Sequence, residues 1–180
     1  MKKLFTVTLL LVSALVASTT AVSAQSASQS YIEKFKDNAI RIMHETGVPA
    51  SIILGVAMHE SGSGKSAIAQ NLNNQFGVKG GGGAVYYRHN KKVKSSYKRY
   101  ESVMDSFNDF ARIMTERKQF SHLADKLTNY DYKGWAKGIQ RSGYASSKKW
   151  SAQVLGIINK YDLNELDKAP AQKTELAEAN

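Results

Sequence analysis

One segment of this chain is apolar on every side, which makes it the natural centre of a helical domain. The segment Ile52-Ile53-Leu54-Gly55-Val56-Ala57-Met58 is followed by His59 and Glu60. Helices that are apolar all round are buried in protein cores, and Pro49 fits the first turn of such a helix. We therefore predict a buried central helix that runs from Pro49 to about Glu60.

Glu60 closes this helix and precedes a loop of small residues, Ser61-Gly62-Ser63-Gly64-Lys65-Ser66. A carboxylate at the wall of an apolar element is partly dehydrated, which disfavours its charged form. Such a group can keep its proton near neutral pH and donate it to a leaving oxygen. The small residues beside it leave room for a polymeric substrate. The local pattern is also consistent with a solvated glutamate at a helix end.

The remaining elements follow from the spacing of apolar residues and from glycine and capping positions. We predict helices at Tyr31 to Thr46, Ser102 to about Arg117, Ser121 to Leu127 and Asp131 to Gly143, a helical turn at Ser66 to Asn71, and a last helix capped by Ser146 or Ser147. Residues between Ala84 and Tyr100 favour a β-hairpin. The glycines Gly80 to Gly83 predict a mobile loop before it.

The first 24 residues have the three parts of a secretory signal peptide. Lys2 and Lys3 form the basic start, Leu4 to Val16 is apolar, and Val22-Ser23-Ala24 is a small-x-small cleavage signal. The apolar stretch is too short to span a bilayer. We therefore predict an exported protein, periplasmic, secreted or associated with the cell wall, with no integral membrane segment once the signal is removed.

The rest of the chain is divided into a polar leader at 25–30, one compact domain at 31–163 and a disordered tail at 164–180. The chain has no cysteine, which excludes disulfides, thiolate metal sites, a thiol nucleophile and a lipoprotein anchor. Removing Lys2 and Lys3 lowers the formal charge from +10 to +8. Such a protein prefers anionic partners such as cell-wall polymers, membrane surfaces or nucleic acid. Nothing beyond charge supports nucleic acid, and the export signal argues against it, so we predict no nucleic-acid partner.

Basic residues gather in the predicted hairpin. They are Arg88, Lys91, Lys92, Lys94, Lys98 and Arg99. The cluster either binds a polyanion or is a solvated ribbon. The histidines His44, His59 and His122 are too scattered to suggest a metal site.

Six segments form a set in this order along the chain: Gly47-Val48-Pro49-Ala50-Ser51-Ile52, His59-Glu60-Ser61-Gly62-Ser63-Gly64-Lys65-Ser66, Asn73-Asn74-Gln75-Phe76-Gly77-Val78-Lys79, Tyr97-Lys98-Arg99-Tyr100, Asp105-Ser106-Phe107 and Gly143-Tyr144-Ala145. Taken together, they resemble the bacterial endo-β-N-acetylglucosaminidases of glycoside hydrolase family 73, which include autolysins and flagellar-rod hydrolases. The similarity runs from about Tyr31 to Asp162.

The resemblance implies an α+β fold, a mostly helical lysozyme-like domain with a small β-hairpin lobe beside the substrate cleft. It implies a monomer without metal or cofactor that cleaves peptidoglycan glycan strands at the β-1,4 bond after N-acetylglucosamine. The family's general acid falls on Glu60, and the tyrosine that lines the cleft beside the acid falls on Tyr144, which we expect to be catalytic as well. The expected substrate-binding residues come from the cleft floor and the hairpin: Asn73, Asn74, Phe76, Gly77, His89 and Tyr97.

Many members of the family that this sequence resembles carry a second acidic residue in the hairpin. This sequence departs from that pattern, because no Asp or Glu lies between Glu60 and Glu101. An inverting glycosidase needs a second carboxylate about 6.5–9.5 Å from the first, and a retaining one needs it about 5–5.5 Å away. Three routes remain open. The substrate's own N-acetyl group could act as nucleophile, with Tyr144 orienting it. A later acidic residue (Glu101, Asp105 or Asp109) could reach the cleft, or hydrolysis could be lost. His89 is a further candidate base.

Three other functions compete with the glucosaminidase. A non-catalytic peptidoglycan-binding protein would explain the missing carboxylate. A lytic transglycosylase also works with one glutamate, although the Asn-Asn-x-Phe-Gly and Gly-Tyr-Ala motifs favour the glucosaminidase. A membrane-active cationic protein is disfavoured, because the basic residues lie in a hairpin and not along an amphipathic helix.

Overall fold

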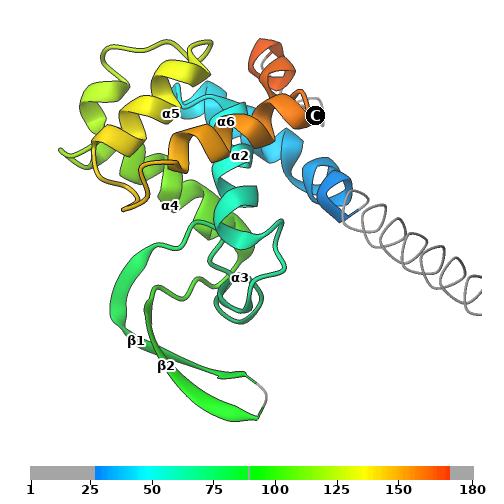
Figure 1. Cartoon of the computed structure of the whole chain (residues 1–180), viewed down its shortest axis with the longest axis vertical. Helices are drawn as coiled ribbons and strands as arrows, with labels where there is room; N and C mark the ends of the chain where they lie inside the picture. Colours follow the sequence, from blue (N-terminus) through cyan, green and yellow to red (C-terminus); the bar gives the residue numbers. More distant parts are fainter. Residues whose placement is uncertain (1–26, 89, 171–180) are drawn as a thin grey trace, which may run out of the picture.

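The computed structural model describes residues 27–88 and 90–170 (Figure 1). A first helix covers residues 27–46. It is followed by α2 (Ala50–Ser61), α3 (Ala67–Leu72), β1 (Lys79–Arg88), β2 (Lys91–Tyr97), α4 (Val103–Glu116), the 3-10 helix η1 (Ser121–Leu123), α5 (Tyr132–Arg141), α6 (Trp150–Lys160) and the 3-10 helix η2 (Leu163–Lys168).

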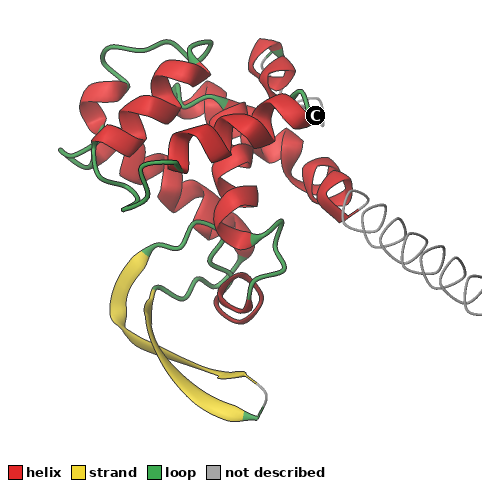
Figure 2. Ribbon diagram, viewed as in Figure 1, coloured by secondary structure: helices red, strands yellow, loops and turns green. Residues whose placement is uncertain are grey.

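The helices form a body from which one long hairpin projects (Figure 2). Strands β1 and β2 pair antiparallel in a two-stranded sheet. This is the mostly helical α+β architecture with a hairpin lobe that the sequence predicts. Within the described residues, no helix combines the length and the apolar character needed to span a bilayer.

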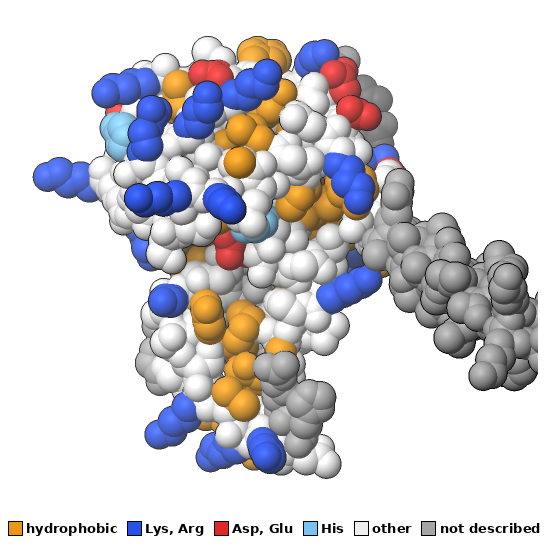
Figure 3. All heavy atoms as spheres, in the orientation of Figure 1, with side chains coloured by type: hydrophobic (Ala, Val, Ile, Leu, Met, Phe, Trp, Pro, Cys, Tyr) orange, Lys and Arg blue, Asp and Glu red, His pale blue; other side chains and the backbone are white. Residues whose placement is uncertain are grey.

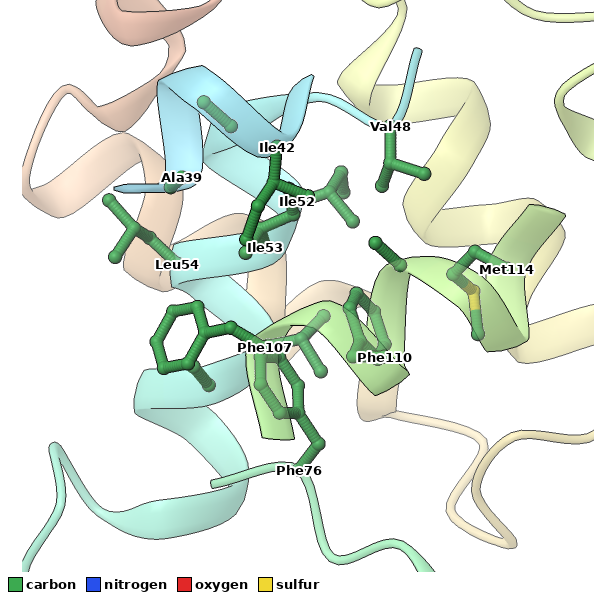
Figure 4. Close-up of a cluster of buried hydrophobic side chains, with 14 of the residues drawn as sticks. Ala39, Ile42, Val48, Ile52, Ile53, Leu54, Phe76, Phe107, Phe110 and Met114 are labelled. Atoms are coloured by element: carbon green, nitrogen blue, oxygen red, sulfur yellow. The ribbon is translucent and has the colours of Figure 1, made fainter. Parts of the chain in front are cut away.

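Helix α2 lies at the centre of the body, as expected from its apolar composition. All of its residues are buried except His59 and Glu60 at its last turn. It contacts α4, α5, α6 and η2. Figure 4 shows its isoleucines beside Phe107 and Phe110 of α4. A helix covered on so many sides is a rigid support for the glutamate at its end.

A glycine lets α6 approach α2 closely. A Cβ placed at Gly55 would lie 2.8 Å from Cγ1 of Ile158, a distance that real side chains do not tolerate. Trp150, at the start of α6, is 1% exposed. The close packing of the two helices therefore fixes Trp150 relative to the end of α2.

The cap predicted at Asp131 is confirmed, since its side chain accepts from the Gly134 N–H at the start of α5. Two further caps were not predicted. Ser66 caps α3, and Ser102 and Asp105 form a reciprocal capping box at the start of α4.

Two helix predictions are wrong in detail. Helix α6 begins after Lys149, because Ser147 instead closes a turn in which its carbonyl accepts from the Trp150 N–H. The segment predicted as a helix from Ser121 to Leu127 is the short 3-10 helix η1 followed by turns.

The glycine run was predicted as a loop, and this prediction is wrong. Gly80 to Gly83 belong to β1. Between the pairs Lys79–Tyr97 and Ala84–Ser95 the register advances five residues on β1 and two on β2. Gly80 and Gly83 have φ values of 119° and 82°, which glycine adopts without strain. The glycines therefore form an irregular bulge within the strand.

The predicted borders of the domain are too narrow at both ends. Residues 27–30, expected in a polar leader, are helical. Residues 164–168, expected to begin a disordered tail, belong to η2 together with Leu163, and Leu163 and Asp167 are buried. The Asp167 carboxylate accepts hydrogen bonds from the Ser51 N–H (2.8 Å) and hydroxyl (2.6 Å). Pro49 gives α2 no side-chain cap, so η2 supplies one. The predicted signal peptide and residues 171–180 lie outside the described residues.

Candidate active site

A cavity of about 410 Å³ lies between the helical body and the base of the hairpin. Figure 3 shows a small acidic patch at this waist, and apolar side chains on the hairpin below it. The cavity is lined by Glu60, Phe76, Gly77, Val78, Lys79, Tyr97, Ile113, Arg117, Gln119, Phe120, Gly143, Tyr144, Ala145 and Ser146. Five predicted site residues therefore meet here: Glu60, Phe76, Gly77, Tyr97 and Tyr144.

Glu60 is held in one orientation by a residue that the sequence did not single out. The indole N–H of Trp150 donates to Glu60 Oε1 at 2.7 Å. The other oxygen, Oε2, lies toward Gly77, where an added Cβ would come within 3.6 Å of it. One carboxyl oxygen is thus engaged by the protein, and the other is available at the cavity.

Gly77 keeps the space beside Glu60 open. Its φ of +63° is in the left-handed region that favours glycine. A Cβ at this position would also come within 3.8 Å of Tyr97 Cε1. The preceding residue, Phe76, is stacked on Phe110 at 4.4 Å and meets Phe107 edge-on at 5.0 Å. Aromatic packing therefore fixes the backbone that approaches Glu60.

Tyr144 lies beside Glu60 with its hydroxyl donating to the Phe76 carbonyl at 2.8 Å. Its ring packs against Trp150, with ring centroids 5.3 Å apart. Burial raises the pKa of the Tyr144 hydroxyl well above its usual value, and the charge of Glu60 adds to the rise. The hydroxyl is therefore protonated, and its oxygen keeps lone pairs that can accept a further hydrogen bond.

The two predicted asparagines hold the backbone and do not line the cavity. Asn73 Nδ2 donates to the carbonyls of Tyr100 and Glu101. Asn74, 1% exposed, donates to the carbonyls of Val78 and Lys98. These contacts fix the segment that carries Phe76 and Gly77. His89, also predicted at the site, lies outside the described residues.

The three candidate second carboxylates are engaged elsewhere. Asp105 closes the capping box of α4, and Glu101 is exposed. Asp109 is ion-paired with Lys98 at 2.9 Å and Arg112 at 2.5 Å. Glu60 is the one acidic residue among the described residues that line the cavity.

Asp109 also accepts a hydrogen bond from the Tyr100 hydroxyl at 2.7 Å. Burial acts to raise the pKa of Asp109, but the hydrogen bonds from Tyr100, Lys98 and Arg112 outweigh this effect and hold the pKa below its usual value. The group is therefore a charged anchor between α4 and the base of the hairpin. Residues 27–88 and 90–170 contain no group of three or more His, Asp or Glu side chains arranged to hold a metal ion.

Residues 36–163 match the glucosaminidase family, described as mannosyl-glycoprotein endo-beta-N-acetylglucosaminidase. The chain belongs to this family. The expected glycosidase family is thus confirmed, and the matched region includes the whole cavity.

Two curated relatives share this glucosaminidase region. The chain is 28% identical over 154 residues to the exo-glucosaminidase LytG of Bacillus subtilis, covering 77% of this chain and 53% of LytG. It is 27% identical over 156 residues to the peptidoglycan hydrolase FlgJ of Vibrio cholerae, covering 79% of this chain and 46% of FlgJ. The chain spans about half the length of these relatives.

Solved structures share the glucosaminidase fold. A peptidoglycan hydrolase from Sphingomonas sp. A1 superposes with a TM-score of 0.61 at 26% identity, covering 82% of this chain and 99% of that one. The catalytic domain of the autolysin Auto from Listeria monocytogenes gives a TM-score of 0.61 at 21% identity, covering 78% and 87%. The expected lysozyme-like α+β fold is confirmed.

Proposed function

We propose that this protein is an exported peptidoglycan hydrolase that cleaves the β-1,4 bond after N-acetylglucosamine, with Glu60 as general acid. The observation that carries the proposal is a single carboxylate at an open cavity, oriented by Trp150 and flanked by Tyr144. The names of the relatives support the substrate, since LytG is an exo-glucosaminidase and FlgJ a peptidoglycan hydrolase. The apparent signal peptide supports export.

Glu60 would protonate the glycosidic oxygen as the bond to the anomeric carbon breaks. The Trp150 hydrogen bond occupies Oε1, so the proton is best carried on Oε2, which faces the space above Gly77. General acid catalysis of this kind contributes about 10²–10⁴ to a rate.

Because Glu60 is the one carboxylate among the described residues that line the cavity, the nucleophile would be the amide oxygen of the substrate's N-acetyl group. This oxygen attacks the anomeric carbon while the leaving oxygen takes the proton from Glu60, which gives a cyclic oxazolinium ion. Glu60, now a carboxylate, then takes a proton from water as that water attacks the anomeric carbon and displaces the amide oxygen. Two inversions leave the product in the β configuration.

Tyr144 would hold the N-acetyl group in position for this attack. Its hydroxyl donates to Phe76 in the free protein, and its oxygen can accept from the amide N–H of the substrate. Alternatively, the hydroxyl turns from Phe76 to the amide oxygen when substrate binds. Either contact places the acetamido group beside Glu60.

The deciding experiment is mass spectrometry of fragments released from purified sacculi. New reducing ends on N-acetylglucosamine are expected. Reducing ends on N-acetylmuramic acid would contradict the proposed bond. The relative LytG is an exo-enzyme, so the length distribution of the fragments also distinguishes endo from exo cleavage.

The same spectra test the second candidate, a lytic transglycosylase, which the single carboxylate also favours. That enzyme would leave anhydro ends lighter by one water. Release of no fragments at all, with binding retained, would indicate a non-catalytic glycan-binding protein. Proton NMR of the fresh reducing end adds the stereochemistry, since an initial α-anomer would exclude attack by the N-acetyl group.

A further inference from the structure

Two cationic side chains line the cavity from opposite lobes. Lys79 is the first residue of β1, and Arg117 follows the last residue of α4. Both side chains are exposed. Neither makes an ion pair with a carboxylate among residues 27–88 and 90–170. Other basic residues nearby do, since Lys98 and Arg112 are both paired with Asp109.

The backbone at each cation is held in place. Lys79 pairs with Tyr97 at the base of the hairpin. The Arg117 N–H donates to Ile113, and its carbonyl accepts from Phe120 at 2.7 Å. The positive charge of Arg117 reaches the cavity wall, since it acts to lower the pKa of the Tyr144 hydroxyl against the larger effect of burial. The backbone that carries both cations is thus held in place at the cavity rim, and their exposed side chains line the cavity from there.

Among the described residues that line the cavity, the charge balance is therefore positive even when Glu60 is ionised, with two cations and one anion. A neutral glycan would leave both cations without a partner. Arginine is suited to bind a carboxylate through two parallel hydrogen bonds, and lysine adds a point charge. The expected ligand group is a carboxylate on the glycan.

We infer that Lys79 and Arg117 are specificity-determining residues that select glycan strands carrying carboxylates, on the lactyl group or its attached peptide, over neutral N-acetylglucosamine polymers. This inference rests on the proposed function. The cations bind the acidic substituent while Glu60 addresses the neighbouring bond. They act on substrate binding and not on proton transfer.

The test compares two substrates that differ only in charge. One is a soluble peptidoglycan fragment, and the other is the same fragment with its carboxyl groups converted to primary amides. The variants are Lys79→Gln and Arg117→Gln. Matched controls are Lys118→Gln and Lys94→Gln, which remove one exposed positive charge each at positions that do not line the cavity.

The wild-type protein is expected to prefer the charged fragment. An exposed ion pair contributes a few-fold in affinity, so each cavity variant should raise KM for the charged fragment about three- to fivefold, with kcat nearly unchanged. The same variants should leave KM for the amidated fragment within about twofold. Arg117→Lys should keep most of the preference, and the controls should keep all of it. The preference should fade as salt rises.

Equal losses on both fragments, or a fall in kcat instead of a rise in KM, would show that these residues have a structural or chemical role and would overturn the inference. Binding measured on a Glu60→Gln background separates this inference from the proposed function. A charge preference in binding without turnover in the wild type supports the inference and refutes the function. Turnover without any preference refutes the inference alone.

Discussion

At the scale of single residues, Glu60 is the group on which the proposed chemistry depends. Glu60→Gln keeps an oxygen that can accept from the Trp150 indole, so the fold should be retained. The amide has no acidic proton to transfer to the leaving oxygen, and turnover on sacculi should fall about 10²–10⁴-fold. Lysis of sacculi followed by turbidity measures this, with the melting temperature as control. A variant with a few tenths of normal activity would exclude Glu60 as the acid.

Tyr144 is expected to act in the transition state more than in binding. Tyr144→Phe removes the hydrogen bond to Phe76 and the group proposed to orient the acetamido substituent. We expect kcat to fall at least tenfold while KM changes little, and stability to fall by about 1 kcal/mol. Tyr130→Phe, at a ring that is 64% exposed, is the matched control. A normal kcat in Tyr144→Phe would exclude a catalytic role for the hydroxyl and would mean that Tyr144 contributes only the packing of its ring.

The sequence identified the catalytic candidate but not its partner. Glu60 stands out because a charged residue ends an apolar helix. Trp150 is separated from it by 90 positions, and their contact depends on how α6 packs on α2, which no local pattern encodes. For Asn73 and Asn74 the sequence indicated the correct loop but not the contacts of the side chains. Their amides donate to backbone carbonyls, because the irregular chain there has few other partners.

At the scale of elements, the crossing helices α2 and α6 each offer a glycine, one for a test substitution and one for its matched control. Gly55→Ala places a methyl group 2.8 Å from Ile158 Cγ1, so overpacking should cost about 1–3 kcal/mol. Gly156 in α6 has no atom within 4 Å of an added Cβ. Gly156→Ala should therefore stabilise the protein by up to about 1 kcal/mol through helix propensity. Urea denaturation measures both. A neutral Gly55→Ala would mean that the two helices separate at little cost.

The contact between η2 and the start of α2 should make stability depend on pH. Burial raises the pKa of the Asp167 carboxyl from 3.8 to about 6, although hydrogen bonds from Ser51 favour its charged form. A group with a raised pKa stabilises the fold most below its unfolded pKa. That contribution is lost as pH rises through the folded value. The wild type should lose stability between about pH 4 and pH 6 for this reason.

Asp167→Asn isolates this effect, because the amide can keep both contacts with Ser51 without the buried charge. The difference in unfolding free energy between Asp167→Asn and the wild type should shift in favour of the variant from pH 4 to pH 6 and then level off. Chemical denaturation at several pH values measures it. Asp167→Ala, which removes the cap, should be less stable than Asp167→Asn by about 1–2 kcal/mol at every pH. A difference independent of pH would refute the titration of Asp167.

Helices with strong apolar periodicity or a capping residue were predicted well, and α4 shows why, since both signals coincide there. Two elements were missed because their signals are tertiary. Gly80 to Gly83 are in a strand because β2 supplies the pairing that glycine alone does not favour. Residues 163–168 have a polar composition, and they are ordered because Leu163 and Asp167 find partners on the body.

At the scale of the whole molecule, the hairpin extends its charge away from the cavity. Lys91, Lys92 and Lys94 are exposed, whereas Arg99 is engaged with backbone carbonyls. Attraction between the exposed lysines and an anionic wall is screened over about 8 Å at physiological ionic strength, so it is strongest at low salt. Replacing these three lysines by serine should therefore weaken binding to sacculi at low salt. It should also flatten the salt dependence. Co-sedimentation with sacculi is the measurement, and unchanged binding would make the hairpin a solvated ribbon.

The pairing of Trp150 with Glu60 also has a consequence for the order in which the protein is made. Loop closure over so many residues costs entropy, so such contacts are expected to form late in folding. Helix α6 leaves the ribosome after the other parts of the cavity. A nascent chain therefore carries Glu60 long before the indole that orients it exists. Glu60 therefore reaches the orientation that it has in the folded protein only after α6 has been made and has packed on α2.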